Sequence, residues 1–191
     1  KDEFHQDVDR SIKTLQDITG DHVNMFRAPG FSINETNKWA FEVLYELGIR
    51  IDSSVFPAGR AHGGMPTYAS SNPSLLNYNG ITIKEFPINT YKILSKSFIY
   101  SGGGYFRLLP YDFIKKFSND SEYIMSYFHP RDFDYNQPMI KDLSIFRKFK
   151  SYVGLKNSIN KLNNWLFDFD FLDISQADNQ ICWDNIKQIN L

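Results

Sequence analysis

The stretch VNMFRAPGF, residues 23–31, is a short apolar run that ends abruptly in an arginine and a proline. Residues 7–19 before it and residues 36–47 after it repeat apolar side chains every three or four positions, which is the periodicity of one helical face. A strand enclosed by helices favours parallel strand pairing. The stretch therefore predicts an α/β fold with a polar cluster where this strand ends.

The same order of helix, strand and polar cluster recurs further along the chain. The apolar residues 49–51 run into Asp52-Ser53-Ser54, and a predicted strand at 123–128 runs into His129-Pro130-Arg131-Asp132. In a parallel β/α barrel the strands' carboxyl ends lie on one face, where the loops build the active site. We therefore expect Arg27, Asp52 and His129 to share a rim, on a barrel with too few units to close.

Weaker signals define the other segments. Residues 142–151 are basic and expected to be exposed, and a polar, peripheral tail is expected over 176–191, after a single domain over 1–175. The remaining predictions are a loop at 57–75, strands at 81–88 and 169–174, a glycine-rich turn at 101–107, and helices at 110–117 and 155–166.

Composition excludes some classes of protein. The 191 residues carry a net charge of −1 without a basic block, which argues against nucleic acid as a partner. The single cysteine, Cys182, forms no internal disulfide, and no apolar run reaches the ~20 residues of a membrane span. The chain starts with Lys1, and we expect it to be an excised fragment whose compartment this end does not reveal.

Three polar residues are candidates for chemistry. His129 carries an imidazole, a side-chain group that can donate a proton in catalysis, although a backbone carbonyl could equally satisfy it. Asp52 could fix an imidazole tautomer, or simply form an Asx-turn. Arg27 could lower a carboxylate pKa or bind a substrate oxygen, and its alternative is a surface ion pair.

The glycine run Gly102–Gly104, followed by Tyr105 and Phe106, matches neither nucleotide-binding pattern. A flexible backbone beside aromatic rings suits sugar stacking, and a plain tight turn is the alternative. The other histidines do not have metal-ligand spacing, so no complete metal site is predicted; they are His5, His22 and His62.

Four stretches, FRAPGFSI, IRIDSSVFP, GGGYFRLLP and YFHP, occur in the order found in polysaccharide deacetylases. Over residues 7–174 the chain resembles the NodB-homology type, and in particular a bacterial subgroup linked to exopolysaccharide biosynthesis. The resemblance implies a distorted, incomplete (β/α)7 barrel, here lacking its first strands. It also implies metal-dependent removal of N-acetyl groups from a polysaccharide or oligosaccharide.

The resemblance also implies roles for residues. Arg27 would tune the catalytic base, Asp52 would steady the acid His129, and the glycan groove would be flanked by Pro29 and Phe31 and bordered by Gly102, Gly103, Gly104, Tyr105 and Phe106. In the family one aspartate and two histidines hold zinc or another divalent metal, but those motifs precede this point and are not in this chain. The chain alone is therefore expected to hold no metal and to be inactive. A non-catalytic carbohydrate-binding relative and a structural fragment without a ligand are the alternatives.

Overall fold

The computed structural model describes residues 1–59, 63–93 and 96–191. The chain divides into two compact units, the first formed by residues 1–89 and 182–191 and the second by residues 90–181. The predicted mixed α/β class is confirmed. No closed barrel is present among the described residues, and the partial (β/α)7 barrel stays a prediction.

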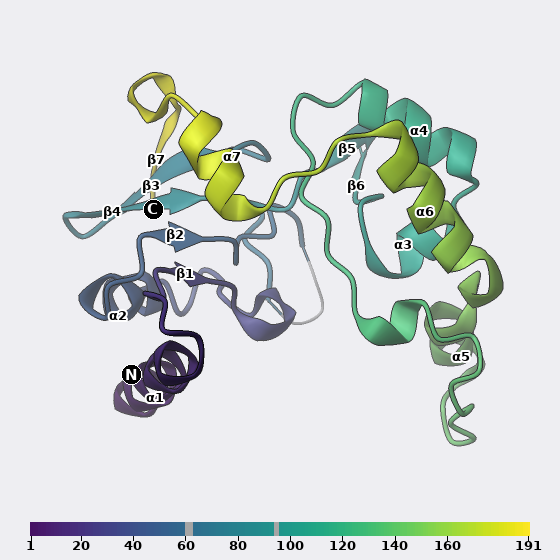
Figure 1. The fold of residues 1–191 in the computed structure, drawn as a ribbon, viewed down its shortest axis with the longest axis horizontal. Coiled ribbons are helices and arrows are strands. Elements are labelled where there is room, and N and C mark those ends of the chain that lie inside the picture. The colour runs from purple at the N-terminus through teal and green to yellow at the C-terminus, as the bar shows by residue number, and fades with distance from the viewer. Residues whose placement is uncertain (60–62, 94–95) are drawn as a thin grey trace. The chain divides into compact units, whose positions relative to one another are not determined.

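A five-stranded sheet forms the centre of the first unit (Figure 1). Three of its neighbouring strand pairs are parallel, namely β1–β2, β2–β4 and β3–β7, and the β3–β4 pair is antiparallel. The predicted parallel pairing of the first two strands is therefore confirmed. In sheet order the strands are β1 (Met25–Phe26), β2 (Ile51–Asp52), β4 (Ile81–Glu85), β3 (Ser74–Tyr78) and β7 (Gln188–Asn190).

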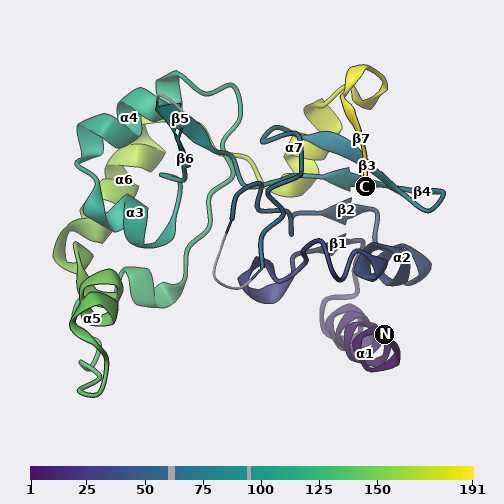
Figure 2. The ribbon, with the colours of Figure 1, turned by 180° about the vertical axis from the view of Figure 1, so that it is seen from behind.

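Helices α1 (Asp2–Thr19) and α2 (Trp39–Glu46) lie next to each other beside the β1 end of the sheet in both views (Figures 1 and 2). Val8 and Ile12 of α1 and the apolar stripe of α2 are buried in one core with side chains of the sheet, whereas Leu15 and Ile18 of the predicted α1 stripe are exposed. Gly20 ends α1 in the left-handed conformation, as the sequence predicts. Helix α2 starts three residues later than predicted, because Thr36 donates to the side chain of Asn34 in the preceding turn.

The β3–β4 hairpin was not predicted, because residues 57–75 were expected to form a loop. Its turn is Asn79-Gly80, and both residues have positive φ, at 45° and 82°. A two-residue Asn-Gly connection is a strong hairpin signal, because these residues tolerate the φ values of a type I′ turn. Strand β7 extends the same sheet from the tail, with Ile189 buried. The division of the chain at residue 175 stays a prediction.

Helices dominate the second unit, and they are α3 (Gly103–Leu108), α4 (Tyr111–Asn119), α5 (Ile145–Tyr152), α6 (Ser158–Asp168) and α7 (Ile174–Gln180). A two-stranded sheet joins β5 (Tyr91–Ile93) to β6 (Lys96–Phe98). Aromatic rings form much of the core, in which Tyr100, Phe106 and Trp165 are completely buried. Short 3-10 helices occur in both units: η1 (Pro29–Phe31), η2 (Pro130–Asp132), η3 (Leu155–Asn157) and η4 (Trp183–Asn185).

Three predictions for the second unit are wrong. Residues 101–107 hold most of helix α3 instead of a turn. Residues 123–128 do not form a strand: Tyr127 makes only an isolated bridge with Gly102, and the apolar side chains of Ile124 and Phe128 pack on the aromatic core. Residues 169–174 are not a strand either, because Asp173 caps the first turn of α7.

The helices at 110–117 and 155–166 are confirmed, as α4 and as η3 with α6. Helix α5, in the basic segment, has no buried residue, as predicted. Among the described residues, no helix has the length and apolar character needed to cross a membrane.

Candidate functional site

In the first unit, the ends of β1 and β2 bring Arg27 against the cluster that follows Asp52. Phe26 and Asp52 are partners in the parallel register. Arg27 donates from Nη2 to Ser53 Oγ at 2.8 Å and from Nε to the Ser53 carbonyl at 3.2 Å. Ser53 Oγ in turn donates to the carbonyl of Phe86, just beyond β4, at 2.7 Å. Three neighbouring strands are thus connected at their carboxyl ends, as the parallel arrangement predicts.

The Ala28-Pro29-Gly30-Phe31 turn is attached to the same cluster. The Ala28 amide donates to Ser54 Oγ at 2.8 Å. Phe31 is buried, with its ring centroid 5.6 Å from that of Phe56 and 5.8 Å from the Arg27 guanidinium carbon. Pro29 is exposed. Of the two residues expected to flank a glycan groove, therefore, Pro29 is at the surface and Phe31 packs beneath Arg27.

Asp52 is completely buried and is hydrogen-bonded to a second buried carboxyl group, that of Glu85. The two residues are partners in the parallel β2–β4 register. Ser54 donates to Asp52 from its amide at 2.9 Å and from its hydroxyl at 2.7 Å. Glu85 Oε1 accepts the Val55 amide at 3.1 Å. The carboxyl pair is therefore held from both strands and from the loop after β2.

The surroundings of the pair raise the pKa of both carboxyl groups. Burial raises the pKa of Glu85 well above its ordinary value, and the neighbouring Asp52 carboxylate raises it further. Burial also raises the pKa of Asp52, while hydrogen bonds from Glu85 and Ser54 and the charge of Arg27 act in the opposite direction. A carboxyl–carboxyl hydrogen bond requires one proton. We therefore assign that proton to Glu85, which leaves one negative charge on the pair beside the Arg27 guanidinium.

Sequence reasoning missed Glu85, although a signal was present. In the alternating strand at 81–88, Glu85 falls on the same face as Ile81 and Ile83. Ile83 is completely buried, so the next position on that face places a carboxyl group in the core. A buried carboxyl group needs a hydrogen-bonding partner or a proton, and this one has both.

His129 belongs to the second unit, where it precedes η2 and is exposed. Its backbone is fixed, because its amide donates to Asp132 Oδ2 at 2.9 Å and its carbonyl accepts the Asp132 amide at 2.8 Å. The shared site of His129 with Arg27 and Asp52 stays a prediction.

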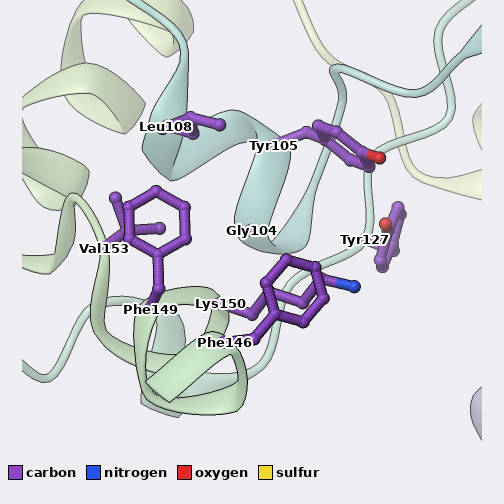
Figure 3. Close-up of a pocket in the computed structure, with 8 residues that line it drawn as sticks. All are labelled: Gly104, Tyr105, Leu108, Tyr127, Phe146, Phe149, Lys150 and Val153. Carbon is purple, nitrogen blue, oxygen red and sulfur yellow. The ribbon is translucent and has the colours of Figure 1, made fainter.

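The second unit also contains a pocket of about 300 Å³, which Figure 3 shows. Helix α3 supplies one side and helix α5 the other, and Tyr127 lies beside them. Its lining residues are Gly104, Tyr105, Leu108, Tyr127, Phe146, Phe149, Lys150 and Val153.

Two of the predicted groove residues, Gly104 and Tyr105, line this pocket. Gly102 and Gly103 instead allow Tyr127 to approach: a side chain on Gly102 would overlap the Tyr127 carbonyl, and one on Gly103 would lie 3.4 Å from the Tyr127 ring. Phe106 is completely buried in the aromatic core. The contribution of α5 to the pocket was not predicted, because its exposed aromatic residues are far along the chain from the glycine run.

Arg107 fastens the two sides of the pocket together. It follows Phe106 on α3 and is buried, yet it donates to the carbonyls of Lys150 at 3.0 Å, Ser151 at 2.7 Å and Val153 at 3.3 Å. Its Nε forms an ion pair with Asp132 Oδ1 at 3.2 Å, and this carboxylate is also buried. The carbonyls at the end of α5 are thereby held against α3.

The described residues do not fit a zinc site. No group of three or more histidine, cysteine, aspartate or glutamate side chains among them could hold a metal ion. The Asp52–Glu85 pair is completely buried, both Asp52 oxygens accept hydrogen bonds from Ser54, and Glu85 Oε1 accepts the Val55 amide. His22 contacts Gln16 on α1 at 3.2 Å, and His62, predicted to be a loop residue, lies outside the described residues.

Comparison with known proteins places this two-unit α/β chain in a family. The model of a family described as Domain of unknown function (DUF3473) matches residues 53–179, and the chain belongs to that family. The match includes Asp52's neighbours Ser53 and Ser54, the Glu85 strand, the glycine run and His129. No curated protein and no solved structure matches the chain.

Proposed function

We propose that the chain forms part of a metal-dependent glycan N-deacetylase, a hydrolase that removes N-acetyl groups from a polysaccharide. The sequence resemblance of four stretches to polysaccharide deacetylases motivates the proposal. The observation that carries it is the contact between two of those stretches: Arg27 of FRAPGFSI donates two hydrogen bonds to Ser53 of IRIDSSVFP. Residues 26 positions apart in sequence are thus assembled at one end of the sheet.

In this reaction class a divalent ion such as zinc activates the attacking water. The described residues do not supply its ligands, so the proposal concerns proton transfer and substrate orientation. His129 is an exposed imidazole on a fixed backbone, and it would protonate the leaving amine. Arg27 would orient polar groups of the reacting centre, with its charge balanced by the Asp52–Glu85 pair.

The test gives the full-length protein zinc and an N-acetylglucosamine oligomer and measures released acetate. Removal of a general acid costs about 10²- to 10⁴-fold in rate, and this loss is expected of His129→Ala. His22→Ala is the matched control, because His22 is also exposed and its imidazole contacts the side chain of Gln16 on α1. Equal release by His129→Ala and the unchanged protein would remove His129 from the acid role.

The second candidate is a carbohydrate-binding relative without catalysis. The pocket beside α3 favours it, because exposed aromatic rings and a charged side chain surround a space suited to a small ligand. Saturable binding of the same oligomer, with no acetate released in the presence of zinc, would support this candidate against the enzyme.

A further inference from the structure

We propose that the pocket between α3 and α5 is a glycan subsite for a sugar residue that carries a carboxylate, with its ring against aromatic side chains and its anionic group at Lys150. The inference rests on the proposed function, because it names the glycan class: an N-acetylated polysaccharide that also contains uronate residues. None of the roles expected from the sequence includes α5.

The pocket has the size and the surfaces for one sugar. Its volume of about 300 Å³ is at the lower end of the range for small-molecule sites. Tyr105 is 54% exposed and Phe146 is 66% exposed, so both rings remain available to a ligand. Sugar rings present C–H groups on their faces, and aromatic faces with their negative quadrupole attract these groups.

The charge of Lys150 indicates that the sugar bound in this pocket is acidic. Lys150 is the only charged residue among those that line the pocket. Its Nζ lies 4.5 Å from the centroid of the Phe146 ring and has no ion-pair partner in the described part of the chain. In Figure 3 the hydroxyl groups of Tyr105 and Tyr127 and the nitrogen of Lys150 lie on the side away from Leu108 and Val153. One end of the pocket is therefore polar and cationic, and a carboxylate fits there.

Contacts within the protein hold the walls of the pocket in place, so the pocket is preformed. Arg107 holds the carbonyls of Lys150, Ser151 and Val153, and its ion pair with Asp132 is buried. Gly154 follows this segment with φ at 70°, and a side chain there would overlap the Arg107 carbonyl. A rigid pocket loses little conformational entropy on binding, which favours a small, defined ligand.

An anionic membrane is the alternative partner for this surface. Ile145 of α5 is 88% exposed, and basic residues accompany it on the helix, as in helices that lie on anionic membranes. Such a helix needs only an apolar face with basic neighbours. A clamped pocket with tyrosine hydroxyl groups is not required for a membrane, and we therefore favour the sugar.

The experiment titrates the full chain with two N-acetylated hexasaccharides. One is a hyaluronan fragment with alternating glucuronate and N-acetylglucosamine, and the other is neutral chitohexaose. We expect the hyaluronan fragment to bind about tenfold more tightly at low salt, with an advantage that shrinks as salt rises. Lys150→Gln should abolish the difference, whereas the control Lys148→Gln, on the same helix but outside the pocket lining, should retain it.

Three results would overturn the inference, and they are distinguishable from a failure of the proposed function. Equal binding of both hexasaccharides, with acetate still released, would reject the acidic sugar but not the deacetylase. Binding of neither, with acetate still released, would reject the subsite. Binding to vesicles of phosphatidylglycerol and phosphatidylcholine that is lost in Lys150→Gln, without glycan binding, would assign the surface to a membrane.

Discussion

Replacement of Arg107 by Met is expected to lower the free energy of unfolding of the second unit by about 3–5 kcal/mol, the usual cost of removing one partner of a buried ion pair. The Asp132 carboxylate would remain buried without its cation. The carbonyls of Lys150, Ser151 and Val153 would lose their donor at the same time. Urea unfolding measures the loss, and hydrogen exchange of the α5 amides should accelerate most.

Arg131→Met is the matched control, because this neighbouring arginine is exposed, and it should change the free energy of unfolding by no more than about 0.5 kcal/mol. The double variant Arg107→Met, Asp132→Leu should lose less than the sum of the two single variants, since it leaves no unpaired charge. Additive losses, or an Arg107→Met variant as stable as the control, would contradict the assignment of Arg107 as the connection between α3 and α5.

Glu85→Ala is expected to destabilise the first unit by about 2–4 kcal/mol, because the Val55 amide loses its acceptor and Asp52 loses its proton donor in the core. Glu85→Gln should cost less than about 1 kcal/mol at neutral pH, since an amide can both accept from Val55 and donate to Asp52. Similar destabilisation by the two variants, measured by urea unfolding, would show that Glu85 does not act as a hydrogen-bond donor.

The Asp52–Glu85 pair makes the free energy of unfolding depend on pH, and the raised pKa of Glu85 sets the direction. In the unfolded chain Glu85 loses its proton near the ordinary glutamate pKa of 4.5. In the folded chain, burial and the charge of Asp52 keep the proton bound to a higher pH. Unfolding above pH 4.5 therefore releases a proton, and the free energy of unfolding falls as pH rises towards the folded pKa. Glu85→Gln should become progressively more stable relative to the unchanged protein over this range. A constant difference would place the proton elsewhere.

The polar cluster in the first unit could be predicted in part from the sequence. Parallel strands end on one side, so the apolar runs before Arg27 and Asp52 were sufficient to bring these residues together. Glu85 was not predicted, because a lone glutamate in an alternating strand matches no catalytic or metal-binding motif. Its partner Asp52 lies on a neighbouring strand, and that pairing exists only in the folded sheet.

The second unit was harder to predict for physical reasons. Glycine disfavours a helix by about 1 kcal/mol per residue, so Gly103 and Gly104 argued for a turn. Helix α3 forms nonetheless, because it buries Phe106 and lets Arg107 reach α5. The apolar residues 123–128 have the composition of a strand, yet their partners are aromatic side chains of a core and not a neighbouring strand. A short apolar run does not distinguish these two outcomes.

The most direct test of the central claim is a double-mutant cycle between Arg27 and His129 on acetate release from an N-acetylglucosamine oligomer. Arg27→Lys keeps the charge but cannot reproduce both hydrogen bonds to Ser53, and His129→Ala removes the proposed acid. If both residues act at one reacting centre, the change in activation free energy of the double variant differs from the sum of the changes in the two single variants by at least about 0.5 kcal/mol. Strictly additive effects would mean that the guanidinium and the imidazole do not act on the same substrate.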